Sequence, residues 1–144
     1  MLYIKDEIVR WEIAAMELTK SELEVMNVLW KAKEPLSRND IIELSENKSW
    51  KDSSIHILLN GLLKKEAIYE AGFRKSGKTY GRLFAANISG EEYYAKAVFS
   101  AGGEENLPML FSALVHSNYM TPEAIDELEE LLEKRKKELK AEQK

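Results

Sequence analysis

Apolar residues recur at helical spacing in residues 19–33, the first long stretch of the chain with a clear pattern. Thr19 and Glu22 have the spacing of a capping box, in which the hydroxyl accepts from the backbone of Glu22 and the carboxylate reaches back to Thr19. Pro35 disfavours helical geometry at the residue before it, so the helix should end there. The apolar positions of this predicted helix are Leu23, Met26, Leu29 and Trp30, with Val28 at the margin.

A second and a third helix are predicted between Ser37 and Lys65. Ser37 is placed to cap residues 38–47, and Asp52 or Ser53 is placed to cap the third helix. In the third helix, one narrow arc that a core would cover holds Ile55, Leu58, Leu59 and Leu62. The opposite arc holds Ser53, Ile57, Asn60, Gly61 and Lys64. An isoleucine and a helix-weakening glycine are unusual on a surface that faces solvent.

Residues 67–88 have the pattern of a β-hairpin. Two stretches rich in Ile, Tyr, Phe and Leu flank the turn "KSGK" at residues 75–78. Three helices followed by a hairpin form the winged helix-turn-helix arrangement, in which the third helix docks in the major groove of DNA. Leu36 is a candidate for a very short additional strand.

Three more helices are predicted after residue 89, at residues 90–101, 106–116 and 121–144. In the last of these, Thr121 is the expected N-cap and Pro122 the first helical residue. These helices have more apolar surface than they can cover among themselves, which favours a symmetric dimer. The expected dimerisation residues are Leu107, Leu110, Phe111, Leu114, Ile125, Leu128, Leu131 and Leu132.

The sequence therefore predicts a mainly α protein in three parts. Residues 1–17 form an N-terminal extension, residues 18–89 a winged-helix DNA-binding domain, and residues 90–144 a helical dimerisation domain. The net charge of −4 does not exclude a nucleic-acid partner, because the acidity is concentrated in one part. Residues 1–90 hold 14 Lys and Arg against 13 Asp and Glu, whereas residues 91–144 hold 7 against 12.

Several classes of function are disfavoured by the composition. The chain has no cysteine, so thiolate metal sites and cysteine nucleophiles are excluded, and its two histidines are far apart in the sequence. The carboxylates follow helix-surface spacing and do not form a converging pair. We therefore expect no enzyme activity, no metal and no cofactor. No apolar run approaches the length of a membrane span and the first residues lack a secretory pattern, so a cytoplasmic protein is expected.

Candidate DNA-binding residues lie on the third helix and in the hairpin. Around the hairpin tip, no acid accompanies the cations Arg74, Lys75, Lys78 and Arg82. Such a cluster suits phosphate contacts, with a solvated basic loop as the alternative. Asn60 can pair with adenine, and Ile57 can touch a thymine methyl group. The remaining candidates are Ser53 and Ser54 for phosphate or base, Gly61 for close approach of the backbone, and Lys64 for phosphate or for the helix dipole.

Five stretches of the chain resemble one known family. They are "LTKSELEVMNVLW" (18–30), "NKSWKDSSI" (47–55), "LLKKEAI" (62–68), the glycine pair at 102–103, and "EAIDELEELLEK" (123–134). Together they resemble the penicillinase-repressor and methicillin-resistance-repressor (BlaI/MecI-type) family of winged-helix transcription regulators. The resemblance implies a homodimeric repressor that binds a palindromic operator in double-stranded DNA. It also implies a membrane sensor-protease as a partner, because that route inactivates many members of the family.

The sequence departs from the family pattern at two places. His56 and Gly61 stand where the recognition helix of the family carries arginines, so His56 joins the candidate DNA-binding residues on this resemblance. Leu110-Phe111 is the nearest equivalent of the Asn-Phe pair at which family members are cleaved. Two functions therefore remain open: a repressor that reads an operator, and a winged-helix module that has lost sequence-specific reading and uses Ile57 to bind protein.

Overall fold

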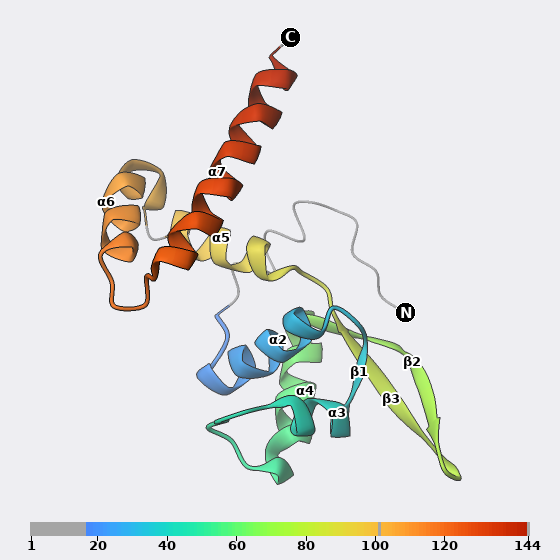
Figure 1. The fold of residues 1–144 in the computed structure, drawn as a ribbon. Helices are drawn as coiled ribbons and strands as arrows, with labels where there is room; N and C mark the ends of the chain where they lie inside the picture. The colour runs from blue at the N-terminus through green and yellow to red at the C-terminus, as the bar shows by residue number, and fades with distance from the viewer. Residues whose placement is uncertain (1–16, 101, 144) are drawn as a thin grey trace. The chain divides into compact units, whose positions relative to one another are not determined.

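The computed structural model describes residues 17–100 and 102–143, which fall into two compact units divided after residue 101 (Figure 1). The predicted N-terminal extension lies outside the described residues apart from Glu17. The first unit contains α2 (Lys20–Ala32), β1 (Leu36–Ser37), α3 (Arg38–Leu44), a 3₁₀ turn (Asp52–Ser54), α4 (Ile55–Lys64), β2 (Ile68–Ser76), β3 (Thr79–Ala86) and α5 (Gly90–Ser100). The predicted order of three helices and a hairpin is confirmed.

The caps of α2 and α3 are the ones that the sequence indicates. Thr19 Oγ1 accepts from the backbone N–H of Glu22 at 3.2 Å, and Glu22 Oε1 accepts from the backbone N–H of Thr19 at 2.9 Å. Ser37 and Asp40 form the equivalent pair at the start of α3, at 3.1 and 3.0 Å. Both helices therefore begin where two otherwise unpaired backbone donors are satisfied.

The hairpin belongs to a three-stranded antiparallel sheet with the order β1-β3-β2. The predicted short strand at Leu36 is confirmed, because Leu36 pairs with Phe84 of β3. Ser76 pairs with Thr79, so the turn has a two-residue loop whose first residue, Gly77, has a φ of 64°. Glycine adopts this angle without strain. Figure 1 shows β2 and β3 extending past the helices as a long arm, which is the wing of this fold.

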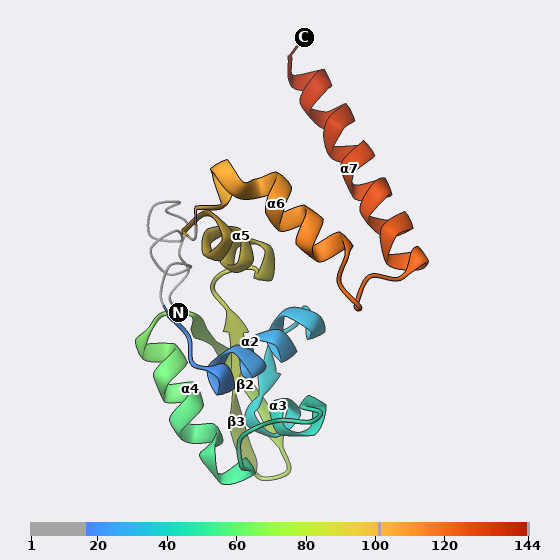
Figure 2. The same ribbon diagram turned by 90° about the vertical axis from the view of Figure 1, so that its left-hand side faces the viewer.

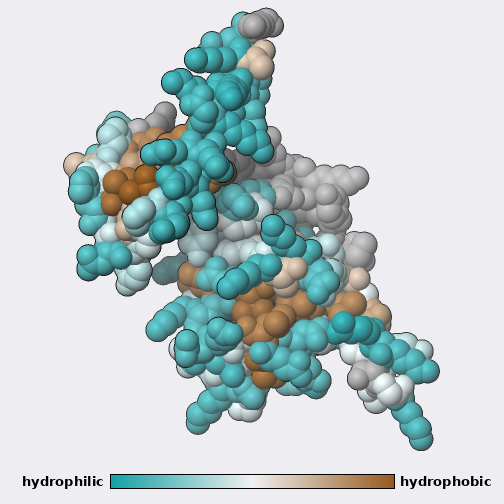
Figure 3. All heavy atoms as spheres, viewed as in Figure 1, coloured by the Kyte–Doolittle hydropathy of each residue, from teal (hydrophilic) through white to brown (hydrophobic). Residues whose placement is uncertain are grey.

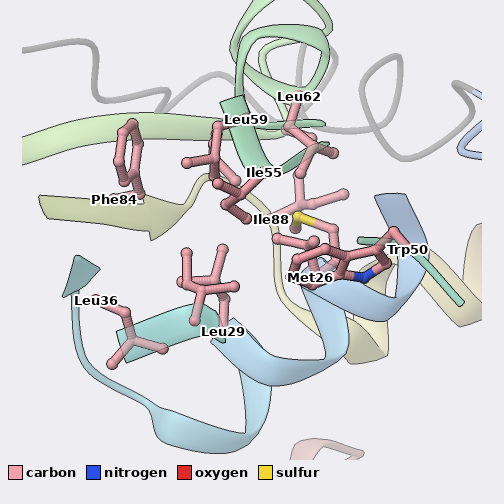
Figure 4. Close-up of a cluster of buried hydrophobic side chains, with 13 residues drawn as sticks. Met26, Leu29, Leu36, Trp50, Ile55, Leu59, Leu62, Phe84 and Ile88 are labelled. Atoms are coloured by element: carbon pink, nitrogen blue, oxygen red, sulfur yellow. The ribbon is translucent and has the colours of Figure 1, made fainter. Parts of the chain in front are cut away.

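One apolar core joins the helices to the base of the sheet (Figure 4). Met26 and Leu29 from α2 meet Ile55 and Leu59 from α4, and Phe84 of β3 closes one side. The other buried apolar residues are Val25, Leu36, Ile41, Trp50, Leu62, Ala67, Ile68 and Ile88. This core fixes which side of α4 faces inward, and it therefore fixes which side faces solvent.

The helix α5 packs on α2 and belongs to the first compact unit. The indole Nε1 of Trp30 donates to the carbonyl of Ile88 at 2.8 Å, and the Trp30 ring lies 5.7 Å from the Tyr93 ring. A Cβ atom on Gly90 would lie 3.2 Å from Trp30, so the absence of a side chain there permits the close approach. The segment 90–100 is thus anchored to the winged helix through Trp30.

The second unit consists of α6 (Gly103–Val115) and α7 (Pro122–Glu142). Thr121 caps α7 as expected, accepting from the backbone N–H of Ala124 at 3.1 Å. The helix α6 begins three residues before the predicted start, and it includes Pro108. The two helices diverge from their connecting loop and make little contact with each other (Figure 2). No described side chain of this unit is buried, so the unit has no core of its own.

Candidate nucleic-acid interface

The side of α4 opposite the core carries most of the residues expected to bind DNA. We call His56, Ile57, Asn60 and Lys64, together with Ser53 of the preceding 3₁₀ turn, the outer face of α4, and all five are exposed. Ile57 is 75% exposed, which is unusual for a large apolar side chain on a helix anchored by Ile55, Leu59 and Leu62. Ser54 is half-buried at the end of the 3₁₀ turn. The structure therefore brings polar hydrogen-bonding groups and one apolar side chain onto a single accessible surface.

Gly61 lies on a different side of α4 from the one expected. A Cβ atom at this position would lie 2.7 Å from Oε2 of Glu22 on α2, so Gly61 packs against α2 and is half-buried. Helical periodicity placed Gly61 in the exposed arc, and it could not indicate that α2 covers this position. The contact with Glu22 accounts for the glycine without a role in approaching DNA.

Glu22 holds the end of α4 against the start of α2. Its Oε1 lies 2.5 Å from Nζ of Lys65, which also donates to the carbonyl of Glu17 at 3.0 Å. Burial acts to raise the pKa of the Glu22 carboxyl, but the hydrogen bonds from Lys65 and Thr19 outweigh it, and the pKa lies below its ordinary value. The carboxylate is thus kept ionised in a buried position.

The wing cations divide into paired and unpaired groups. Arg74 forms an ion pair with Asp40 of α3, and its Nη2 donates to Oγ of Ser37 at 3.3 Å. Nη1 of Arg82 lies 2.5 Å from Oε1 of Glu70 on β2. The backbone N–H of Ser37 and the guanidinium of Arg74 together lower the pKa of Asp40 despite its partial burial. Lys75 and Lys78 are exposed and make no ion pair with any described residue. The sequence could not indicate these pairs, because both acids lie outside residues 71–90.

A groove between the helices and the wing includes residues that the sequence analysis did not single out. Its volume is 240 Å³, and the polar side chains that line it include Arg38, His56, Tyr80 and Arg82. Nη1 of Arg38 lies 2.7 Å from Nε2 of His56. Arg38 is the first residue of a short helix, where helical periodicity carries no information about a neighbour 18 positions along the chain.

The expected dimerisation residues lie on an open apolar surface of the second unit. Six of the eight are exposed, and Leu110 and Leu128 are half-buried. Figure 3 shows hydrophobic residues gathered over α6. Met109, Val115, Tyr119 and Leu139 are also exposed and were not among the expected residues. Leu139 continues the stripe of α7 seven positions after Leu132, whereas Tyr119 lies beyond the end of α6 and Met109 faces away from Leu107 and Leu110 at helical spacing.

The sequence profile of the penicillinase repressor family matches residues 18–134. The chain belongs to the penicillinase repressor family. It is 27% identical to the penicillinase repressor of Bacillus licheniformis over 124 residues, which are 83% of this chain and 92% of that protein. It is also 27% identical to the methicillin resistance regulatory protein MecI of Staphylococcus aureus strain N315 over 121 residues, 83% of this chain and 95% of that protein.

One solved structure similar to this penicillinase repressor family member is the solution structure of monomeric BlaI from Bacillus licheniformis in complex with the blaP half-operator. The two chains are 32% identical, and the match covers 54% of this chain and 89% of that chain with a TM-score of 0.40. A crystal structure of the Staphylococcus aureus transcription regulator MepR is 17% identical, covers 85% of this chain and 81% of that chain, and has a TM-score of 0.40.

Two further observations concern other kinds of site in this family member. Among the described residues, no group of three or more His, Cys, Asp or Glu side chains could hold a metal ion. Within residues 17–100 and 102–143, no helix is long and apolar enough to cross a membrane.

Proposed function

We propose that this protein is a transcriptional repressor that binds a palindromic operator in double-stranded DNA as a homodimer. The observation that carries the proposal is the outer face of α4, where exposed hydrogen-bonding side chains surround an exposed Ile57 on a well-anchored helix. Membership of the penicillinase repressor family supports the same function, since its relatives include a penicillinase repressor. A helix of this kind, third in a winged helix-turn-helix, is the element that enters the major groove.

The proposed contacts fall into two chemical classes. Asn60 forms paired hydrogen bonds with an adenine edge, and Ile57 packs against a thymine methyl group. Ser53 and Ser54 donate to phosphate or base, and Lys64, Lys75 and Lys78 neutralise phosphates. Arg74 and Arg82 have five N–H donors each, so they can contact phosphate while keeping their carboxylate partners. Gly61 is left out of the proposal because it packs on Glu22.

Dimerisation is proposed through the apolar surface of α6 and α7. A unit in which no described side chain is buried cannot stabilise its helices through a core of its own, and a second copy supplies the missing apolar contacts. Two copies of α4 then meet half-sites separated by roughly 34–36 Å, or by a multiple of that distance. A sensor-protease is not part of the proposal, because Leu110 and Phe111 lie within α6 and do not reproduce the Asn-Phe pair.

The test is selection of bound sequences from a random DNA pool, followed by titration of the selected duplex and a scrambled duplex at two salt concentrations. We expect a palindromic sequence to be enriched and its affinity to fall steeply with salt, because bound phosphates release counterions. Absence of enrichment, together with an affinity that does not depend on salt, would refute the proposed function.

Two substitutions separate base contacts from phosphate contacts. Asn60→Ala should alter the selected sequence at one position per half-site and weaken the original site by about 1–3 kcal/mol. Lys78→Ala should weaken selected and scrambled duplexes alike and lower the salt dependence. The assignment of roles is wrong if Asn60→Ala weakens all duplexes equally.

A second function, binding of a protein partner, is favoured by the exposure of Ile57. A large apolar side chain at the middle of an exposed helix face is a common anchor in protein contacts. In that case Ile57→Ala should leave DNA affinity unchanged at every salt concentration. A loss of DNA affinity for thymine-containing sites in the same variant favours the repressor.

A further inference from the structure

The outer face of α4 contains no arginine, and its cation is Lys64. Lys65, the next cation, is committed to Glu22 through the 2.5 Å ion pair. An arginine presents paired donors that match the two acceptors of a guanine edge or of a phosphate group, whereas a lysine presents a point charge. Any arginine contact near the start of α4 must therefore come from another element.

Arg38 of α3 lies at this position. Its Nη1 donates to Nε2 of His56, which stands on the outer face of α4 one helical turn before Asn60. Because arginine has only donors, the imidazole must accept through Nε2, and the protonated Nδ1 is left as a further donor. Both side chains are exposed and line the groove between helices and wing.

Arg38 also differs from the other arginines in the partner of its positive charge. Of the three arginines in the described part of the first unit, Arg74 is paired with Asp40 and Arg82 with Glu70. Arg38 contacts a histidine and no carboxylate among the described residues, so its positive charge is oriented without being neutralised. An oriented, unneutralised guanidinium is well suited to bind an acceptor on DNA, because less rotamer entropy is lost on binding.

We propose that Arg38, oriented by His56, supplies the arginine contact of this winged helix to DNA. The inference rests on the proposed function and names a specificity-determining residue for it. The acceptor is a pair of oxygen or nitrogen atoms on the duplex, either the O6 and N7 atoms of guanine or two phosphate oxygens. His56 is a positioning residue, which fixes the direction of the guanidinium through its Nε2.

The experiment measures affinity for the duplex that the wild-type protein selects from a random pool, and for the same duplex with each guanine in turn replaced. Arg38→Ala should weaken binding to the selected duplex at least about tenfold. Arg38→Lys should recover only part of the loss, because the paired donors are missing. Lys31→Ala, which removes one exposed positive charge from α2, is the matched control and should change affinity little.

The role of His56 is tested with substitutions that remove or keep its hydrogen-bond acceptor. His56→Phe keeps an aromatic ring without an acceptor and should weaken binding nearly as much as Arg38→Ala. His56→Gln keeps an acceptor oxygen and should retain most of the affinity. The double variant Arg38→Ala, His56→Phe should lose little more than either single variant, since both act on one contact. Thermal melting should stay unchanged in all variants, because both side chains are exposed.

The outcomes separate the possible acceptors from failure of the inference. A loss confined to one guanine position assigns Arg38 to that base, and a uniform loss with a lower salt dependence assigns it to phosphate. If Arg38→Ala weakens binding no more than Lys31→Ala while the wild-type protein binds its selected duplex, the inference is overturned and the proposed function stands. If the wild-type protein selects nothing and binds without salt dependence, both are overturned.

Discussion

Gly61 packs against Glu22 where α4 meets α2, so replacing Gly61 by alanine has two opposing effects on stability. Alanine at a helix-interior position is favoured over glycine by about 0.8–1 kcal/mol. A Cβ atom at Gly61, however, would lie 2.7 Å from the Glu22 carboxylate, which Lys65 and Thr19 hold in place. Displacing a buried, hydrogen-bonded carboxylate costs about 1–3 kcal/mol, so the second effect should be the larger.

The effect of Gly61→Ala on the free energy of unfolding should therefore change sign when Glu22 is replaced by alanine. In the wild-type background we expect it to lower the free energy of unfolding by about 1 kcal/mol, from the difference of the two effects. In a Glu22→Ala background the same substitution should raise that free energy by about 1 kcal/mol. Urea unfolding of the four proteins measures both values, and the same sign in both backgrounds would contradict the contact.

The lowered pKa of Glu22 predicts a dependence of stability on pH. Because the folded-state pKa lies below the ordinary value of 4.5, the contribution of the carboxylate is fully present above that value and is lost as pH falls through the folded-state pKa. We expect the stability difference between the wild-type protein and Glu22→Gln to shrink as the pH is lowered from neutrality below the ordinary value. A difference that stays constant over this range would show that the charge of Glu22 does not matter. Asp40 is unchanged in both proteins, so its own titration cancels.

Contacts between single residues were the part of the site that the sequence could not predict. The exposure of Ile57 and Asn60 followed from the 3.6-residue period, because the opposite arc was apolar enough to be the core. The ion pairs of Arg74 and Arg82, and the contact of Arg38 with His56, join residues that are 12 to 34 positions apart. No local pattern encodes such pairs, so they require the folded chain.

At the scale of elements, caps predicted the starts of α2, α3 and α7 but not that of α4. Asp52 and Ser53 lie in a 3₁₀ turn, and α4 begins after Ser54 without a side-chain cap. The caps at Thr19 and Ser37 are short-range interactions, and they placed the starts of α2 and α3 directly. The start of α6 was predicted wrongly at residue 106, where the dense run of apolar residues begins. The helix instead begins at Gly103, after Gly102 with a φ of 81°, and tolerates Pro108.

The end of α2 offers a test of how helix ends contribute to stability. Lys33 terminates the helix with a φ of 57°, a left-handed conformation that costs a residue with a side chain roughly 1–2 kcal/mol. Lys33→Gly should raise the free energy of unfolding by about 0.5–1 kcal/mol, after the greater freedom of glycine in the unfolded chain is subtracted. Lys31→Gly, within the same helix, should lower it by about 1 kcal/mol. Thermal or urea unfolding compares the two, and equal signs would contradict this account.

On the scale of the whole molecule, the two units differ in how they are stabilised. The first unit has a core to which α2, α3, α4 and the sheet all contribute, whereas the second unit has no buried side chain among its described residues. The sequence predicted uncovered apolar surface for all three helices after residue 89, and only α6 and α7 fall in the second unit. It could not indicate that α5 packs on α2, because Tyr93 and Trp30 are 63 positions apart.

The proposed dimer predicts that charge on α6 should dissociate the protein. Phe111→Asp places a carboxylate on the apolar surface and should convert the dimer to a monomer in size-exclusion chromatography with light scattering. Ser112→Asp adds the same charge to the neighbouring position and serves as the control, with no dissociation expected. The near-ultraviolet circular dichroism of the first unit should be unchanged in both variants. A wild-type protein that is monomeric at all concentrations would refute the dimer.

The indole of Trp50 is buried in the core, and its Nε1 donates to no acceptor among the described residues. An indole that is buried from water and has no hydrogen-bond acceptor has an excited state that little solvent relaxation can lower, so its emission is expected at short wavelength. In a protein with Trp11 and Trp30 replaced by phenylalanine, the emission wavelength of Trp50 would show whether the packing beneath α4 stays intact. Such a signal would distinguish a variant that has lost an interaction on its surface from one that has begun to melt inside.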